Sequence, residues 1–136
     1  MTPTQKTLVK QTFAQLVPIA DQAAAMFYGK LFEMDPALRP LFKTPLPEQG
    51  KKLMQMIGMC VSKLDTIEEI VPAVKDLGRR HAGYGVTDAH YGTVAGALLW
   101  TLEQGLGPAF TPEVKAAWTA VYGVLATTMQ TGARAA

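Results

Sequence analysis

The chain has 136 residues, of which 49% are hydrophobic and 18% charged, and its net charge is +2. This length predicts a single domain over residues 1–136, and the composition is too apolar for a disordered protein. Basic residues form no stripe for nucleic acid, and no apolar run approaches the roughly 18 residues that cross a bilayer. The lone Cys60 and an N-terminus without a secretory pattern predict a cytoplasmic protein with no nucleic-acid or membrane partner.

Helical periodicity, punctuated by capping residues and prolines, runs through the whole chain. Thr2-Pro3-Thr4-Gln5 resembles a capping box, and the helix that it opens should end near Pro18. The elements expected next are helices over 19–34 and 35–41, a loop over 42–47 and a helix over 47–64. A helical stretch over 66–81, interrupted or restarted at Pro72, follows, then a helix over 87–106 and a final helix from 111, with a frayed tail from Gly132. No segment alternates with period two over a strand's length. The sequence therefore predicts an all-α fold of six to eight helices.

A histidine ends one of the apolar stripes. Ile70, Val74, Leu77 and His81 follow one another at i, i+4, i+7 and i+11, so the imidazole should point inward from the last turn of a helix that stops at Gly83. Two interpretations stay open at this point. The residue is either a core histidine with a satisfied hydrogen bond or a ligand of a metal or haem, since neutral imidazole is a common iron ligand.

Two further polar side chains, Tyr28 and Gln49, stand at positions where their helices expect apolar residues. Burying each of these groups without a partner would cost on the order of 1–3 kcal/mol. Three such exceptions on three helices, His81 included, favour one shared pocket.

Several segments together resemble bacterial single-domain globins and the globin module of flavohaemoglobins. They follow one another in order across nearly the whole chain and comprise residues 26–32, 41–42, 49–53, 77–81 and 117–123. The resemblance implies a globin fold around a haem pocket.

The same resemblance implies haem b between the helix that begins near Pro47 and the helix that ends at His81. His81 would be the proximal metal ligand, Phe42 would stack on the porphyrin, and Tyr28 and Gln49 would lie on the distal side. The remaining residues that it assigns to the pocket are Leu53 above the iron, the wall residues Leu77, Val86, Val94 and Leu98, and the proximal-side Tyr91. Lys52 and Arg80 are candidates either for propionate contacts or for a solvated surface role.

One departure from the family pattern and the position of the second histidine refine this expectation. In flavohaemoglobins the tyrosine that Tyr91 matches belongs to a network with a glutamate, but the corresponding position falls near Ala135, so the glutamate is missing. His90, the other histidine, lies in the first turn of its helix, where an exposed or capping role is expected. Ligation of the iron by two histidines is therefore not expected, and its sixth position should stay open.

The residue types suit a gas that becomes polar when it binds. Dioxygen takes on partial negative charge on ferrous haem, and both a tyrosine hydroxyl and a glutamine amide can donate hydrogen bonds without burying a charge. The alternative for Tyr28 is an ordinary core aromatic with its hydroxyl bonded to the backbone.

The leading hypothesis is a haem protein that reversibly binds dioxygen or another diatomic gas, such as CO or NO. The alternative is a nitric oxide dioxygenase that oxidises NO to nitrate. Because the chain ends where a flavin reductase domain would begin, this activity would need an external reductase. A third hypothesis is a globin-fold sensor or interaction module that lacks haem.

Overall fold

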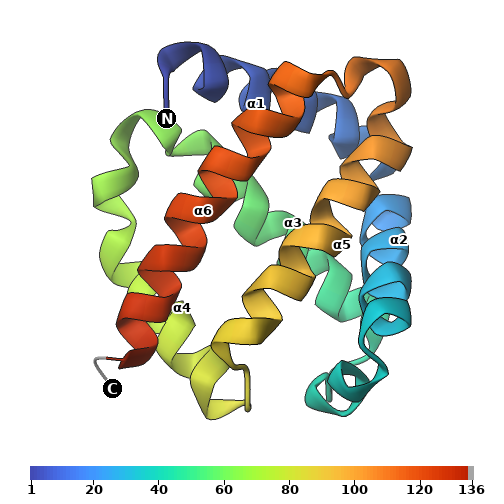
Figure 1. The fold of residues 1–136 in the computed structure, drawn as a ribbon, viewed down its shortest axis with the longest axis vertical. Coiled ribbons are helices and arrows are strands. Elements are labelled where there is room, and N and C mark those ends of the chain that lie inside the picture. Colours follow the sequence, from blue (N-terminus) through green and yellow to red (C-terminus); the bar gives the residue numbers. More distant parts are fainter. Residues whose placement is uncertain (135–136) are drawn as a thin grey trace.

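The computed structural model describes residues 1–134, which contain six α-helices joined by short connections. The helices are α1 (Pro3–Leu16), α2 (Ala20–Met34), α3 (Leu46–Ser62), α4 (Val71–Gly83), α5 (Asp88–Leu106) and α6 (Pro112–Arg134). Four 3-10 segments lie between them: η1 (Val17–Ile19), η2 (Pro36–Leu41), η3 (Leu64–Glu69) and η4 (Gly107–Ala109). Within the described residues there is no strand, so the predicted all-α class is confirmed (Figure 1).

Capping residues set the starts of α1 and α5, as the sequence predicts. The Thr2 hydroxyl accepts a hydrogen bond from the backbone N–H of Gln5 at 3.1 Å, and the Gln5 side chain accepts one from the Thr2 N–H at 3.0 Å. His90 likewise reaches back to the N-terminus of α5, where its Nδ1 accepts from the Thr87 N–H at 3.0 Å. The capping role expected for His90 is therefore confirmed. These bonds satisfy N–H groups that have no partner inside the helix.

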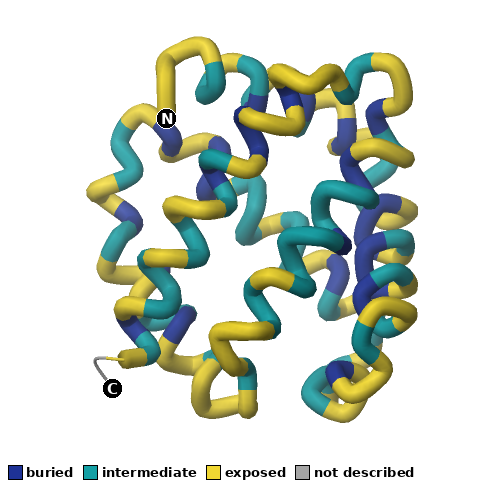
Figure 2. The backbone as a smooth tube through the Cα atoms, in the orientation of Figure 1, coloured by how far each residue is buried: buried dark blue, intermediate teal, exposed yellow. Residues whose placement is uncertain are grey.

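The helices pack in pairs around two main apolar cores. α1 crosses α6, while α2 packs on both α3 and α5, and α4 packs chiefly on α6. In the view of Figure 1, α5 and α6 lie in front of α3. Figure 2 shows fully buried residues along α2 and near the top of the bundle, while the lower parts of α4, α5 and α6 are mostly half-buried or exposed. η3 joins α3 to α4, and Cys60 of α3 shares a small apolar cluster with Val74 of α4.

The larger core contains a buried polar pair that the sequence analysis did not predict. Trp118 Nε1 donates to Thr12 Oγ1 at 2.8 Å, and the Thr12 hydroxyl donates in turn to the Leu8 carbonyl at 2.7 Å. Thr12 and Trp118 are both almost completely buried. The pair joins α1 to α6 across 106 residues of sequence. The periodicity of a single helix cannot predict a contact between residues so far apart in the chain.

Replacing Thr12 by valine is expected to lower the free energy of unfolding by about 1–3 kcal/mol, because the buried Trp118 N–H loses its acceptor. Chemical denaturation measures this change. Thr119→Val is the matched control, since Thr119 lies on an exposed face of α6 and its hydroxyl bonds only to the Lys115 carbonyl. Equal losses in the two variants would show that the buried bond contributes nothing specific.

The C-terminal end corrects one prediction. The sequence pattern predicts a frayed tail from Gly132, but α6 continues to Arg134 and Gly132 is buried. The contact that buries it lies on α4, far away in sequence. Separately, no helix among residues 1–134 is both long and apolar enough to cross a membrane.

Candidate functional site

His81 lies in the last turn of α4 and is half-buried. Its ring atom Nδ1 lies 2.8 Å from the backbone oxygen of Leu77. Because a carbonyl oxygen can only accept, Nδ1 carries the proton and Nε2 keeps a free lone pair. The side chain thus combines both sequence-based interpretations, since its hydrogen bond is satisfied and its second nitrogen can still bind a metal.

The surroundings of His81 favour a neutral imidazole. Burial lowers the pKa of His81 below its usual range, and the charge of Arg80 acts in the same direction, while the Leu77 carbonyl opposes them. A metal ligand must be unprotonated at the binding nitrogen, so this shift suits ligation. Within residues 1–134, no group of three or more His, Cys, Asp and Glu side chains could hold a metal ion. A lone imidazole fits a metal that is already held by a macrocycle, such as haem iron.

The chain turns away from α4 directly after His81. Gly85 has a φ of 96°, in the left-handed region that favours glycine, and the Val86 N–H donates to the His81 carbonyl at 3.1 Å. Tyr84, which the sequence analysis did not single out, is 63% exposed, and its ring centroid lies 6.2 Å from that of His81. The one sequence signal for it is an aromatic residue three positions after a candidate ligand.

Tyr28 stands at the centre of an aromatic cluster between α2 and the segment after η2. Its ring lies edge-on to Phe42, with centroids 5.4 Å apart, and edge-on to Phe27 at 5.1 Å. Phe32 completes the group at 5.4 Å from Phe42. Residues of α3 and α5 that pack against the same cluster are Leu53, Val94, Ala97 and Leu98. The fold therefore brings together the predicted residues Tyr28, Phe42, Leu53, Val94 and Leu98.

The Tyr28 hydroxyl has one weak partner. It lies 3.5 Å from the backbone oxygen of Gln49, at the outer limit of a hydrogen bond. Burial raises the pKa of Tyr28 to about 12, although the nearby Gln49 side chain acts in the opposite direction. The hydroxyl is therefore a protonated donor in a largely apolar setting, and the half-buried Gln49 lies next to it.

The other predicted residues lie outside this cluster. Leu77 and Val86 flank His81 in sequence, and Tyr91 lies in the first turns of α5. The Tyr91 carbonyl accepts a hydrogen bond from the Tyr122 hydroxyl at 2.7 Å, a contact that the sequence analysis missed. Ala135, near which the missing glutamate would fall, lies outside the described residues.

Both candidates for propionate contacts lie on the surface. Lys52 and Arg80 are exposed, and the Arg80 guanidinium pairs with Asp76 at 3.2 Å. This arrangement agrees with the solvated alternative and leaves both cations accessible to a ligand.

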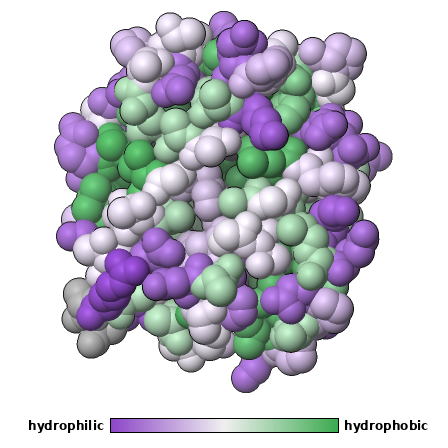
Figure 3. Space-filling view, viewed as in Figure 1, coloured by the Kyte–Doolittle hydropathy of each residue, from purple (hydrophilic) through white to green (hydrophobic). Residues whose placement is uncertain are grey.

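The apolar residues predicted for the haem pocket are incompletely covered by the protein. They are all half-buried and comprise Phe42, Leu53 and the wall residues Leu77, Val86, Val94 and Leu98. Apolar residues are also visible among hydrophilic ones on the face that shows α5 and α6 (Figure 3). Among the described residues, no hydrogen bond or ring contact joins His81 to the Tyr28 cluster. An apolar group that covered these side chains would gain roughly 25 cal/mol for each Å² of apolar surface removed from water.

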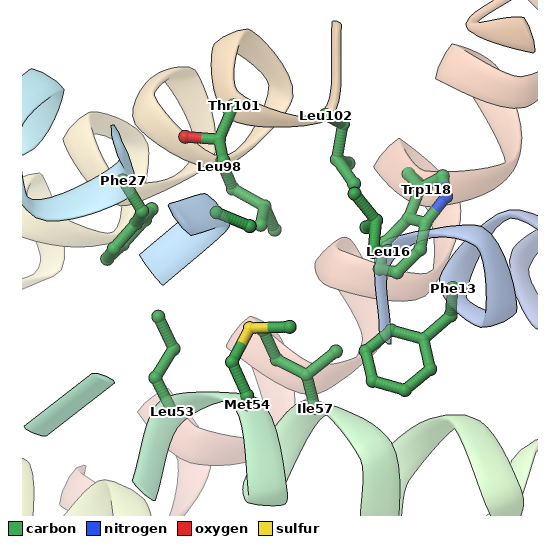
Figure 4. A pocket seen from close by; sticks show the side chains of 11 residues that line it. Phe13, Leu16, Phe27, Leu53, Met54, Ile57, Leu98, Thr101, Leu102 and Trp118 are labelled. Carbon is green, nitrogen blue, oxygen red and sulfur yellow. The ribbon is translucent and has the colours of Figure 1, made fainter. Parts of the chain in front are cut away.

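A small apolar cavity adjoins the Tyr28 cluster (Figure 4). Its volume is about 20 Å³, and Leu53, Met54 and Ile57 point into it from α3. The hydroxyl of Thr101 is turned to the Ala97 carbonyl at 2.8 Å, which leaves the lining dry. His81 does not line this cavity, and its volume is far below that of a porphyrin, so the cavity by itself could not hold haem.

The family model named Globin matches residues 25–129. The chain belongs to the globin family. This membership confirms the fold class and the resemblance expected from the sequence, and it supports haem-based gas binding as the function of the site.

Proteins similar to this chain include curated relatives and a solved structure. The globin is 28% identical to neuroglobin of Danio rerio, over 93% of this chain and 89% of the relative. It is 30% identical to the flavohemoprotein of Bacillus subtilis over 88% of this chain, which spans only 31% of that longer protein. An engineered carbene transferase, a nitric oxide dioxygenase-like protein from Rhodothermus marinus, has a similar structure with a TM-score of 0.88 and 27% identity. That match covers 98% of this globin and 94% of the other chain.

Proposed function

We propose that this globin reversibly binds a diatomic gas, dioxygen foremost, at a haem b held by His81. The observation that carries the proposal is the orientation of the His81 ring. Its Nδ1–H is tied to the Leu77 carbonyl at 2.8 Å, which leaves a neutral Nε2 free to bind iron. When bound, haem would supply a ferrous iron with an open position for the gas.

The other residues of the site would hold the porphyrin and shape the gas side. Phe42 and Leu53 would pack on the ring from the Tyr28 cluster, while Val86 would contact it near His81. The remaining proposed contacts are Leu77, Tyr91, Val94 and Leu98. The Tyr28 hydroxyl and the Gln49 amide would donate hydrogen bonds toward a gas that carries partial negative charge. CO and NO would reach the same position, although CO would gain less from these donors.

Nitric oxide dioxygenation is the second candidate function. The similarity to a flavohemoprotein and to a nitric oxide dioxygenase-like protein favours it. The same donors would serve this activity, but an external reductase would have to return the iron to the ferrous state. Nitrate formation from NO, measured with and without an added electron donor, tests this candidate.

The proposed binding function is tested by absorption spectra of the purified protein as isolated, reduced, and reduced under CO. We expect a strong Soret band that shifts with CO, and a pyridine extract with the spectrum of haem b. A protein that shows no Soret band, even after haemin is added, would overturn both haem functions. Such a protein would instead fit the sensor or interaction module without haem.

A further inference from the structure

The helix that carries His81 touches α6 backbone to backbone. A Cβ atom added at Gly78 of α4 would lie 1.9 Å from the carbonyl oxygen of Met129 in α6. A Cβ atom added at Gly132 of α6 would lie 2.0 Å from the carbonyl oxygen of Lys75 in α4. Each obstacle is backbone, which cannot rotate aside as a side chain can. Both glycines are buried.

The two contacts are reciprocal. Each glycine lies against the backbone of a residue three positions from the glycine of the opposite helix, so the crossing uses Lys75 and Gly78 on one side and Met129 and Gly132 on the other. Interior glycines cost a helix about 0.5–1 kcal/mol each relative to alanine. Their presence here permits a separation of the two helices that side chains would prevent.

This crossing lies one turn from the candidate iron ligand. Gly78 precedes His81 by three residues, so both lie on neighbouring parts of the same helical face. α4 packs chiefly on α6, and it shares a smaller apolar cluster with α3 through Val74 and Cys60. The separation of α4 from α6 therefore sets how far His81 extends toward the space between α3 and α4.

We propose that Gly78 and Gly132 are positioning residues that fix the distance and tilt of His81 relative to the haem iron. The inference rests on the proposed binding of haem at His81. A larger residue at either position forces α4 away from α6 and shifts the imidazole with it. A displacement on the order of 1 Å far from a reacting centre can change rates by up to about 100-fold.

The test compares Gly132→Ala with the wild-type globin, both loaded with haem. The readouts are the iron–histidine stretching band in the resonance Raman spectrum of the ferrous form and the association rate of CO. We expect the band to shift and the rate to change by about tenfold, which corresponds to ~1.4 kcal/mol in the barrier. Gly123→Ala is the matched control, because a Cβ atom at this exposed position of α6 meets nothing within 4 Å. The control should retain the wild-type band and rate.

A second variant keeps the proposal testable if Gly132→Ala does not fold. Met129→Ala removes a side chain that packs against Cys60 and Val74 but adds no bulk between the helices. It should lower thermal stability and leave the iron–histidine band unchanged. A shifted band in Met129→Ala would mean that side-chain packing positions α4, and the proposal would fail.

The outcomes separate this inference from the proposed function. A wild-type protein without a Soret band would refute haem binding itself. A loaded Gly132→Ala protein that loses stability but keeps the wild-type band and CO rate would refute only the positioning role.

Discussion

Replacing His81 by alanine is expected to lower the affinity for haem by at least about 100-fold. Loss of a group that only orients a metal ligand lowers metal affinity by up to about 100-fold, and loss of the ligand itself should cost at least as much. The reason is that His81 offers a free Nε2 in a neutral ring, and residues 1–134 contain no group of three or more His, Cys, Asp and Glu side chains that could hold a metal instead. Titration of the apoprotein with haemin, followed in the Soret band, measures the change.

The control for this variant is His90→Ala. His90 caps α5, so its loss should lower stability and leave haem affinity within a few-fold of wild type. Added imidazole should restore the iron–nitrogen bond in His81→Ala by occupying the space that the side chain vacates. If His81→Ala bound haem with wild-type affinity, the iron ligand would have to be another residue.

The starts of α1 and α5 could be predicted because their causes are local. The capping box at Thr2 and the cap at Thr87 each join residues three positions apart, so a single sequence contains the whole interaction. The frayed tail expected from Gly132 was wrong for the opposite reason. Its burial depends on the backbone of Lys75, which no local pattern reports. The buried hydrogen bond between Thr12 and Trp118 was not predicted for the same reason, because its partners lie far apart in the sequence.

The candidate site was predictable to the extent that its residues break a pattern. Tyr28 and His81 were singled out as polar residues on apolar helix faces, and the structure gives each a partner in the backbone. The geometry that matters for chemistry was not predictable, because the choice of ring nitrogen at His81 depends on where the Leu77 carbonyl points. For Tyr84 the only sequence signal is its place three positions after His81, and the structure adds the contact between the two rings.

The division of the site between two packing units follows from the fold. The residues proposed for the gas side belong to the core of α2, α3 and α5, whereas His81 belongs to α4, which packs on α6. The donor hydroxyl of Tyr28 and the candidate ligand can therefore be altered separately. A change that moves α4 should alter the iron–histidine bond, and a change within the Tyr28 cluster should alter how a bound gas is held.

Replacing Tyr28 by phenylalanine is expected to speed the release of dioxygen by about 10–100-fold. A hydrogen bond to a charged group contributes roughly 1.5–3 kcal/mol, and each ~1.4 kcal/mol corresponds to a factor of ten. In the structure the Tyr28 hydroxyl makes only a weak hydrogen bond to the Gln49 backbone oxygen, at 3.5 Å. Turning toward a bound gas would therefore break only this weak bond. Stopped-flow displacement of dioxygen by CO measures the release rate.

Tyr84→Phe is the matched control, since it removes a tyrosine hydroxyl at a position that is 63% exposed. The pH dependence gives an independent check. An ordinary tyrosine is half ionised near pH 10, but burial raises the pKa of Tyr28 to about 12, so its hydroxyl still donates at that pH. Release from the wild-type protein should therefore stay constant from pH 7 to about 10 and accelerate only as the pH approaches 12. Equal release rates in wild type and Tyr28→Phe would instead make Tyr28 an ordinary core aromatic.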